Sequence, residues 1–306
     1  MSNQEGDRFL LDHIRKGDPD SFSQLVDRYS GRLRAFAARR LSGSSIDPED
    51  AVQETLIGLL QSADRLGGVR SLQAYLFQIL RNKIVDLARK RPEAHGMHQI
   101  PLAEASESTG EKRGYEPVSP TGTPSSYVRR AENVEIRNVV LADILAEVIS
   151  TLRDEGSFRD LKVLEMLFYG SWKNREIATI VGTSEPTVTR VKTAALEKLA
   201  RLAAKHNLVE QPSALVNNED DTTHLIRTTW QENLLSCLKR SSLGSHALGA
   251  LDKEWSNYIT FHLEVVNCEF CAANLADLQS EKEPLSPETR KRIFASSVGF
   301  LRKLEK

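Results

Sequence analysis

The sequence contains few cysteines, few aromatic residues and almost no net charge. Its 306 residues include three Cys, and aromatic residues make up 6% of the chain. Three Cys cannot form a disulfide framework, and the odd number favours a reducing compartment or a metal ligand. The low aromatic content argues against a large β-sandwich. With 41 Lys and Arg against 42 Asp and Glu, the chain is neither a uniformly basic nucleic-acid coat nor a strongly acidic solvating segment.

Long apolar segments are also missing. No apolar run approaches the roughly 18 residues that a membrane span needs, and the polar N-terminus shows no secretory signal. We therefore expect a cytoplasmic protein with no membrane partner. The sequence has no Gly-rich phosphate loop, no G-x-S-x-G motif and no His–carboxylate cluster with catalytic spacing, so we expect no catalytic residues and no enzymatic activity.

Apolar residues recur at helical spacing through most of the chain. Leu25, Tyr29, Leu33 and Phe36 follow one another at steps of three or four, which indicates one face of an amphipathic helix. Alternating β-branched runs are few, so the predicted fold class is all-α. Residues 93–130 differ, because 16 of these 38 positions are Gly, Pro, Ser or Thr, a composition typical of a flexible linker. The chain therefore divides into residues 7–92, the linker 93–130, residues 131–206 and an extension, 207–306.

Residues 175–199 have the pattern of a helix-turn-helix. Ala178 is small where two helices cross closely, and Gly182 follows where the turn needs a positive φ. Val188 and Val191 come after the turn and face the same core. An ordinary helical hairpin would show the same outline, but residues 186–206 carry five Lys or Arg and one acid. We therefore favour a DNA-binding motif whose second helix enters the major groove.

The outward positions of this second helix are the candidates for contacts with DNA. If the two valines point inward, five polar residues face base edges: Ser184, Glu185, Thr189, Arg190 and Thr193. Lys192 and Lys198 would meet phosphates, or would form an ordinary solvated basic face.

Two segments of opposite charge lie in the first block. Residues 71–92 carry five basic side chains, with Asp86 as the one acid. Tyr75 and Phe77 precede these basic residues, and they either stack on unpaired bases or belong to the core. The preceding segment, 47–54, contains four acids and no Lys or Arg. Acidic residues are favourable at the start of a helix because of the helix dipole. The opposite charges of the two segments also suggest that they bind two different partners.

These segments resemble parts of bacterial sigma factors. The sequence DPEDAVQE at 47–54 resembles the region 2.2 signature, and YLFQILRNKIVDLAR at 75–89 resembles regions 2.3 and 2.4. Residues 152–199 look like region 4. The order and spacing, without a helical region 3, are similar to the extracytoplasmic-function (ECF) group of the sigma-70 family. The resemblance implies two helical domains, sigma region 2 and the sigma region 4 helix-turn-helix, joined by a flexible linker and followed by a helical C-terminal extension.

The resemblance also implies a function, partners and residue roles. The chain would bind core RNA polymerase, through the β′ clamp helices and the β subunit, and would direct promoter recognition; an anti-sigma factor is a further partner of such proteins. The residues implied to bind polymerase are Asp47, Asp50, Gln53 and Glu54. Promoter DNA would be bound by Arg81, Asn82, Lys83, Asp86 and Arg89 at the −10 element and by Ser184, Glu185, Thr187, Thr189, Arg190, Lys192 and Thr193 at the −35 element. The alternative is a helix-turn-helix regulator that acts without core polymerase.

The extension, residues 207–306, lies outside this two-domain pattern. Residues 210–281 contain 11 acids and 4 bases, so we expect this part to mask basic surface on region 4. The alternatives are a docking module for a separate partner and a part that the chain needs for stability. Cys268 and Cys271 form a CxxC motif that could bind zinc together with His262, and Cys237 and His246 are further candidates. The zinc-binding anti-sigma fold places its His four residues before the first Cys. Here Glu264 has that position, and His262 would lie about 160° away around a helix, so the sequence favours half-buried thiols and no metal cofactor.

Overall fold

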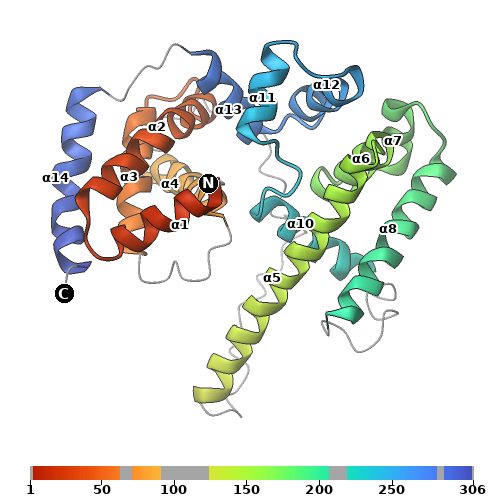
Figure 1. Ribbon diagram of the computed structural model, residues 1–306, viewed down its shortest axis with the longest axis horizontal. Coiled ribbons are helices and arrows are strands. Elements are labelled where there is room, and N and C mark those ends of the chain that lie inside the picture. Colours follow the sequence, from red (N-terminus) through yellow and green to blue (C-terminus); the bar gives the residue numbers. More distant parts are fainter. Residues whose placement is uncertain (1–2, 63–70, 91–123, 207–218, 281–285, 305–306) are drawn as a thin grey trace. The chain divides into compact units, whose positions relative to one another are not determined.

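The computed structural model describes residues 3–62, 71–90, 124–206, 219–280 and 286–304 (Figure 1). These segments contain helices and no strands, so the predicted all-α fold is confirmed. The chain forms two compact units, one made of residues 1–98 together with 232–306 and the other of residues 99–231. Within the described segments, no helix is both long and apolar enough to cross a membrane.

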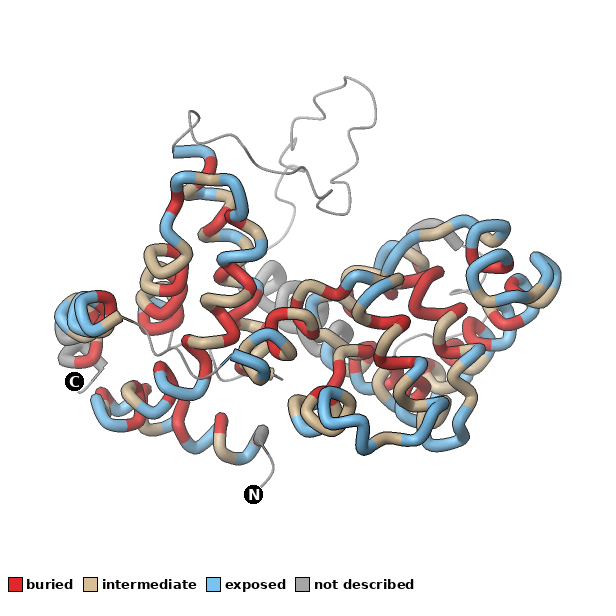
Figure 2. Tube along the Cα trace, turned by 90° about the horizontal axis from the view of Figure 1, so that it is seen from above, coloured by how far each residue is buried: buried red, intermediate tan, exposed pale blue. Residues whose placement is uncertain are grey.

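The N-terminal part of the first unit is a bundle of four helices: α1 (Asn3–Ile14), α2 (Pro19–Arg40), α3 (Pro48–Gln61) and α4 (Leu72–Lys90). Asp18 and Asp47 begin α2 and α3, because their carboxylates accept hydrogen bonds from backbone N–H groups of the first turn and a proline follows each of them. Figure 2 shows buried positions running along the sides of the helices that face one another. Leu33, Leu56 and Phe77 are fully buried there.

The C-terminal extension adds helices to this same unit. They are α11 (Arg240–Ala247), α12 (Lys253–Thr260) with a π-helical turn η4 (Phe261–Val265), α13 (Glu269–Gln279) and α14 (Pro287–Leu304). Helix α13 packs along α2, and α14 packs along α3 (Figure 1). The sequence predicted that the extension masks part of region 4. Its helices α13 and α14 pack on α2 and α3 of the first block, whereas its helix α10 belongs mostly to the second unit.

Aromatic residues from both ends of the chain share one core in the first unit. The Phe270 ring of α13 meets the Phe77 ring edge-on at 4.7 Å between centroids, and Phe77 meets Phe36 in the same way at 5.2 Å. The Phe294 ring of α14 packs edge-on against Phe22 of α2, at 5.8 Å. Helices α13 and α14 of the extension are therefore built into the core of the first unit.

The second unit contains α5 (Pro124–Asp154), α6 (Phe158–Leu164) with a π-helical turn η3 (Glu165–Tyr169), α7 (Asn174–Val181), α8 (Glu185–Lys205) and most of α10 (Glu219–Glu232). Helix α10 joins this unit through Trp230, whose ring lies 6.2 Å from that of Phe168, and through Gln231, which donates a hydrogen bond to the Tyr169 carbonyl at 2.8 Å. Residues 93–123 of the predicted linker lie outside the described residues, and its last seven residues begin α5.

Candidate functional site

The turn between α7 and α8 has the geometry of a helix-turn-helix. Gly182 ends α7 with a φ of 70°, in the left-handed region where glycine is favoured. Ile177 and Val188 are fully buried on either side of this turn, and Val191 is buried one turn further along α8. The Glu176 carboxylate accepts a hydrogen bond from the Lys173 N–H at 3.1 Å and fixes the start of α7.

The start of α8 leaves most of the predicted DNA-binding side chains open to solvent. Thr187 and Lys192 are half-buried, and the others are exposed: Ser184, Glu185, Thr189, Arg190 and Thr193. Asn174 of α7 donates a hydrogen bond to the Thr189 hydroxyl at 3.2 Å, which ties the two helices together on this face. The exposed set lies where a recognition helix meets base edges, and its contacts with DNA remain a prediction.

Helix α4 carries the basic residues of the first block. Asn82, Asp86 and Arg89 are exposed, whereas Arg81 and Lys83 are half-buried. The Arg81 guanidinium lies over the Phe36 ring, 5.8 Å from its centroid, and Lys83 Nζ lies 3.3 Å from a carboxylate oxygen of Glu54. Arg81 and Lys83 are therefore held by contacts within the bundle. The exposed side chains of Asn82, Asp86 and Arg89 are more accessible to DNA.

The two aromatic residues of α4 differ in exposure. Phe77 is fully buried between two other phenylalanine rings, so the interpretation that it stacks on bases is wrong. Its ring supplies core contacts that a flipped base could not reach. Tyr75 is half-buried and stays a candidate for stacking.

The acidic start of α3 is where polymerase binding is predicted. Asp47 caps the helix by accepting a hydrogen bond from the Glu49 N–H at 2.8 Å. Asp50 lies 3.3 Å from an Arg292 nitrogen of α14, and Glu54 pairs with Lys83. Gln53 is half-buried. The extension thus contacts a residue of the predicted polymerase-binding set.

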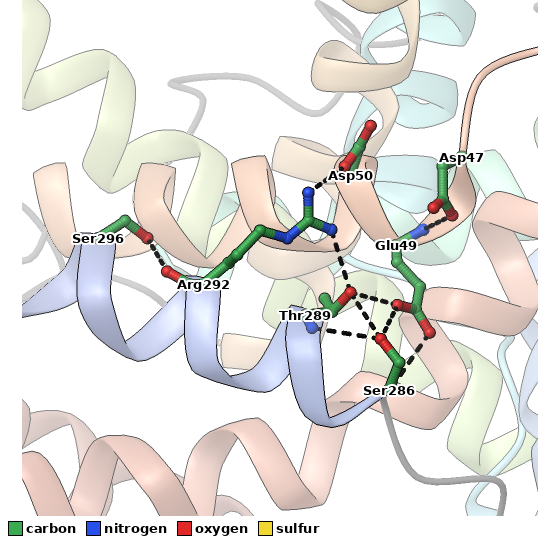
Figure 3. Close-up of polar contacts among 7 residues, drawn as sticks. All are labelled: Asp47, Glu49, Asp50, Ser286, Thr289, Arg292 and Ser296. Carbon is green, nitrogen blue, oxygen red and sulfur yellow. Dashed lines mark hydrogen bonds and ion pairs between the residues drawn. The ribbon is translucent and has the colours of Figure 1, made fainter.

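Glu49 is the centre of this contact, although sequence reasoning did not single it out (Figure 3). Its carboxylate accepts hydrogen bonds from the Ser286 hydroxyl at 2.8 Å, from the Ser286 N–H at 3.3 Å and from the Thr289 hydroxyl. Burial raises the pKa of Glu49, but these hydrogen bonds and the charge of Arg34 outweigh it and hold the pKa below its ordinary value. The carboxylate is therefore ionised at neutral pH, the form that accepts all of these bonds.

The remaining contacts of α14 combine charge and apolar packing. Arg290 pairs with the Asp27 carboxylate of α2 and donates to the Ser23 hydroxyl at 3.2 Å. Ile293 is fully buried on the same side of the helix. The first two turns of α14 contain Arg290, Lys291 and Arg292 in succession. Arg290 pairs with an acid of α2 and Arg292 with an acid of α3, so this end of the extension carries the charge that complements the first block although residues 210–281 are acidic.

Helix α13 is held against the C-terminal half of α2 by polar contacts. Arg40 pairs with Glu269 at 2.7 Å, and Arg39 donates to the Asn267 side chain at 2.7 Å. Asp277 of α13 lies beside Gly31 of α2 and pairs with Arg240 of α11 at 2.5 Å. Helices α11, α13 and α2 thus meet at one ion pair.

The CxxC motif lies at the start of α13, and the helical-wheel argument against His262 is wrong. The π-helical turn ends at Val265, Asn267 has a φ of 52°, and α13 begins only at Glu269. Because the helix is interrupted between Val265 and Glu269, with Asn267 in the left-handed region, His262 and the CxxC motif do not share one continuous helix, and His262 Nε2 lies 3.2 Å from the Cys271 sulfur. The ligand atoms of Cys237, His262, Cys268 and Cys271 lie within 4.8 Å of one another.

Comparisons with known proteins match the first block and more of the chain. Residues 25–92 match the family described as Sigma-70 region 2. The ECF RNA polymerase sigma factor SigL of Mycobacterium tuberculosis is 28% identical over 54% of this chain and 78% of that protein. The RNA polymerase sigma factor NccH of Alcaligenes xylosoxydans xylosoxydans is 33% identical over 38% of this chain and 62% of its own. The RNA polymerase sigma factor CnrH of Cupriavidus metallidurans is 35% identical over 30% and 47%, respectively.

No solved structure gives a significant match to the chain. Residues 25–92 contain most of α2 and all of α3 and α4. The matched segment therefore includes both the acidic helix that α14 contacts and the basic helix beside it.

Proposed function

Because the chain belongs to the ECF group of the sigma-70 family of RNA polymerase sigma factors, we propose that it binds core RNA polymerase and directs it to specific promoters in the cytoplasm. The acidic start of α3 contacts polymerase through Asp50, Gln53 and Glu54. Helix α4 contacts the −10 element, and α8 contacts the −35 element in the major groove. A regulator that acts without polymerase is less favoured, since the curated relatives are sigma factors.

The proposal includes a second step, in which the extension covers the polymerase-binding face of the free chain. The observation that carries it is the bonding of Glu49 by Ser286 and Thr289 within the segment predicted to bind polymerase. Asp50 is engaged by Arg292 in the same contact. A polymerase subunit that binds this face has to displace α14. The apparent affinity for polymerase is therefore the intrinsic affinity multiplied by the fraction of chains in which α14 is released. The extension therefore acts as a built-in inhibitor.

Promoter-dependent transcription with purified core polymerase tests both steps. The full chain should support initiation at its own promoters, and core polymerase alone should not. The Arg292→Glu variant, which places two acids opposite each other, should initiate more strongly at limiting concentration. The exposed neighbour Lys291 provides the control, because Lys291→Glu changes net charge equally. A full chain that binds promoter DNA yet never supports initiation would favour a regulator that acts without polymerase. Equal initiation by the wild-type chain, Arg292→Glu and Lys291→Glu would contradict the inhibitory step.

A further inference from the structure

Four side chains in the extension are arranged as a set of metal ligands. Cys237 lies in the segment before α11, His262 in the π-helical turn, Cys268 at the N-cap of α13 and Cys271 in its first turn. His262, Cys268 and Cys271 are buried, and Cys237 is half-buried. Four residues from three separate segments therefore converge on one point, which the packing of an ordinary bundle does not require.

The spacing of the ligand atoms fits a tetrahedral zinc ion. Zinc–sulfur bonds of about 2.3 Å in tetrahedral geometry place two sulfurs about 3.8 Å apart. The Cys237 and Cys268 sulfurs are 3.6 Å apart, and His262 Nε2 lies 3.2 Å from the Cys271 sulfur. A disulfide would need about 2.05 Å between sulfurs, so the two thiols are placed as neighbours around a common centre and not as a covalent pair. Three Cys and one His is an established ligand set for structural zinc.

Backbone hydrogen bonds around the cluster orient the ligand segments. Cys268 is the N-cap residue of α13, and Cys271 lies in its first turn. The Leu238 N–H donates a hydrogen bond to the Cys271 sulfur at 3.3 Å. The Cys268 N–H donates to the His262 carbonyl at 3.2 Å and fixes the two ligand segments against each other. Such outer contacts orient the ligands of metal sites.

We propose that Cys237, His262, Cys268 and Cys271 bind one Zn²⁺ ion, which joins the segment before α11 to the start of α13. The site has a direct connection to region 2. Asn267, between His262 and Cys268, accepts a hydrogen bond from Arg39, and Glu269, next to Cys268, pairs with Arg40. The metal thus holds the turn from which α13 reaches α2. The binding of zinc does not depend on the proposed inhibitory step, because it is measured on the chain alone.

Metal analysis of the purified full chain tests this site. The reduced protein should contain one equivalent of zinc, and cobalt in its place should give thiolate-to-metal charge-transfer absorption. Because changes beyond the first ligands already reduce metal affinity about 10- to 100-fold, His262→Ala and Cys237→Ala should each lose at least about 100-fold. His262→Cys keeps four ligands and should retain zinc. The control is His246→Ala, since His246 contacts the Ser256 hydroxyl at 3.1 Å and lies outside the cluster.

Helical circular dichroism of each variant separates loss of metal from loss of fold. If a ligand variant does not fold, the titration of zinc into the chelator-treated wild-type chain gives the same information. The proposal would be overturned if the folded, reduced wild-type chain held no more zinc than His262→Ala, or if it gave no charge-transfer band with cobalt.

Discussion

Gly31 of α2 lies directly against the carboxylate of Asp277 on α13. A Cβ atom at position 31 would lie 2.0 Å from an Asp277 oxygen, a distance that real Cβ atoms do not show. Asp277 cannot simply swing away, because it pairs with Arg240 of α11 at 2.5 Å. Glycine in the interior of a helix is destabilising by about 1 kcal/mol relative to alanine. Its presence here is explained by the close approach of the extension.

Gly31→Ala should therefore weaken the packing of α13 on α2. Overpacking of this kind costs about 1–3 kcal/mol, which the gain in helix propensity offsets only in part. Hydrogen exchange measured by mass spectrometry should show faster exchange in α13, while the amides of α7 and α8 stay unchanged. The second change in Gly31→Ala/Asp277→Ala removes the clash and should restore part of the protection, because it also removes the ion pair with Arg240.

Gly244→Ala in α11 is the matched control, because nothing lies within 4 Å of a Cβ at that position. Equal exchange of α13 in Gly31→Ala and in the wild-type chain would show that this contact does not hold the extension.

Thr289→Val should loosen α14, since it keeps the shape of the side chain and removes the hydroxyl that bonds Glu49. Hydrogen bonds to charged groups contribute about 1.5–3 kcal/mol, which corresponds to roughly 10- to 150-fold faster exchange of α14 amides that open locally. Ser296→Ala removes a hydroxyl from the same helix whose bonds go only to carbonyls of α14. If Thr289→Val and Ser296→Ala exchange alike, Glu49 is not an anchor of α14.

Removal of zinc should release the start of α13. Once a chelator has stripped the full chain, the amides of α13 and of the segment around Cys237 should lose protection, because the turn at Asn267 is no longer held. Helices α7 and α8 lie in the other unit and should keep their exchange rates. Re-addition of zinc should reverse the change. Unchanged protection of α13 in a chain shown to be metal-free would mean that the metal does not hold α13 against α2.

Recognition of the −35 element should depend on Arg190, which is exposed on α8. If Arg190 contacts a base edge, Arg190→Ala should weaken binding by about 1–3 kcal/mol and relax the sequence preference at one position. Lys198→Ala should instead weaken binding to all sequences alike and reduce the salt dependence. Binding measured on a randomised promoter library distinguishes the two. The same sequence profile for Arg190→Ala and the wild-type chain would assign Arg190 to the phosphate backbone.

Local features of the fold could be predicted from the sequence, because they depend on neighbouring residues. The turn at Gly182 needs a positive φ, and Val188 follows at a spacing that returns to the core, so the sequence alone predicts the helix-turn-helix. The acid-rich start of α3 was readable for the same reason, since Asp47 and the following proline form a helix start.

Contacts between distant segments could not be predicted. Glu49 and Ser286 are separated by 237 positions, and nothing near either residue specifies the other. The basic start of α14 lies outside the acidic segment 210–281, so the net charge of that segment does not describe it. A helical wheel misplaces His262 because it assumes a continuous helix, whereas the helix is interrupted at Asn267. Periodicity alone gives Phe77 two interpretations, and the rings of Phe36 and Phe270 that enclose it decide in favour of the core.

The affinity of core RNA polymerase for the full chain tests whether the extension covers the polymerase-binding face. The double variant Thr289→Val/Arg292→Glu changes only residues of α14, so the surface that polymerase binds stays intact. Its matched control is Ser296→Ala/Lys291→Glu, which removes one hydroxyl and reverses one charge on the same helix. If α14 is bound to α3 in most free chains, the first variant should bind core polymerase at least about tenfold more tightly than the wild-type chain, and the control should not. Equal or weaker binding by the first variant would contradict a covering role for the extension.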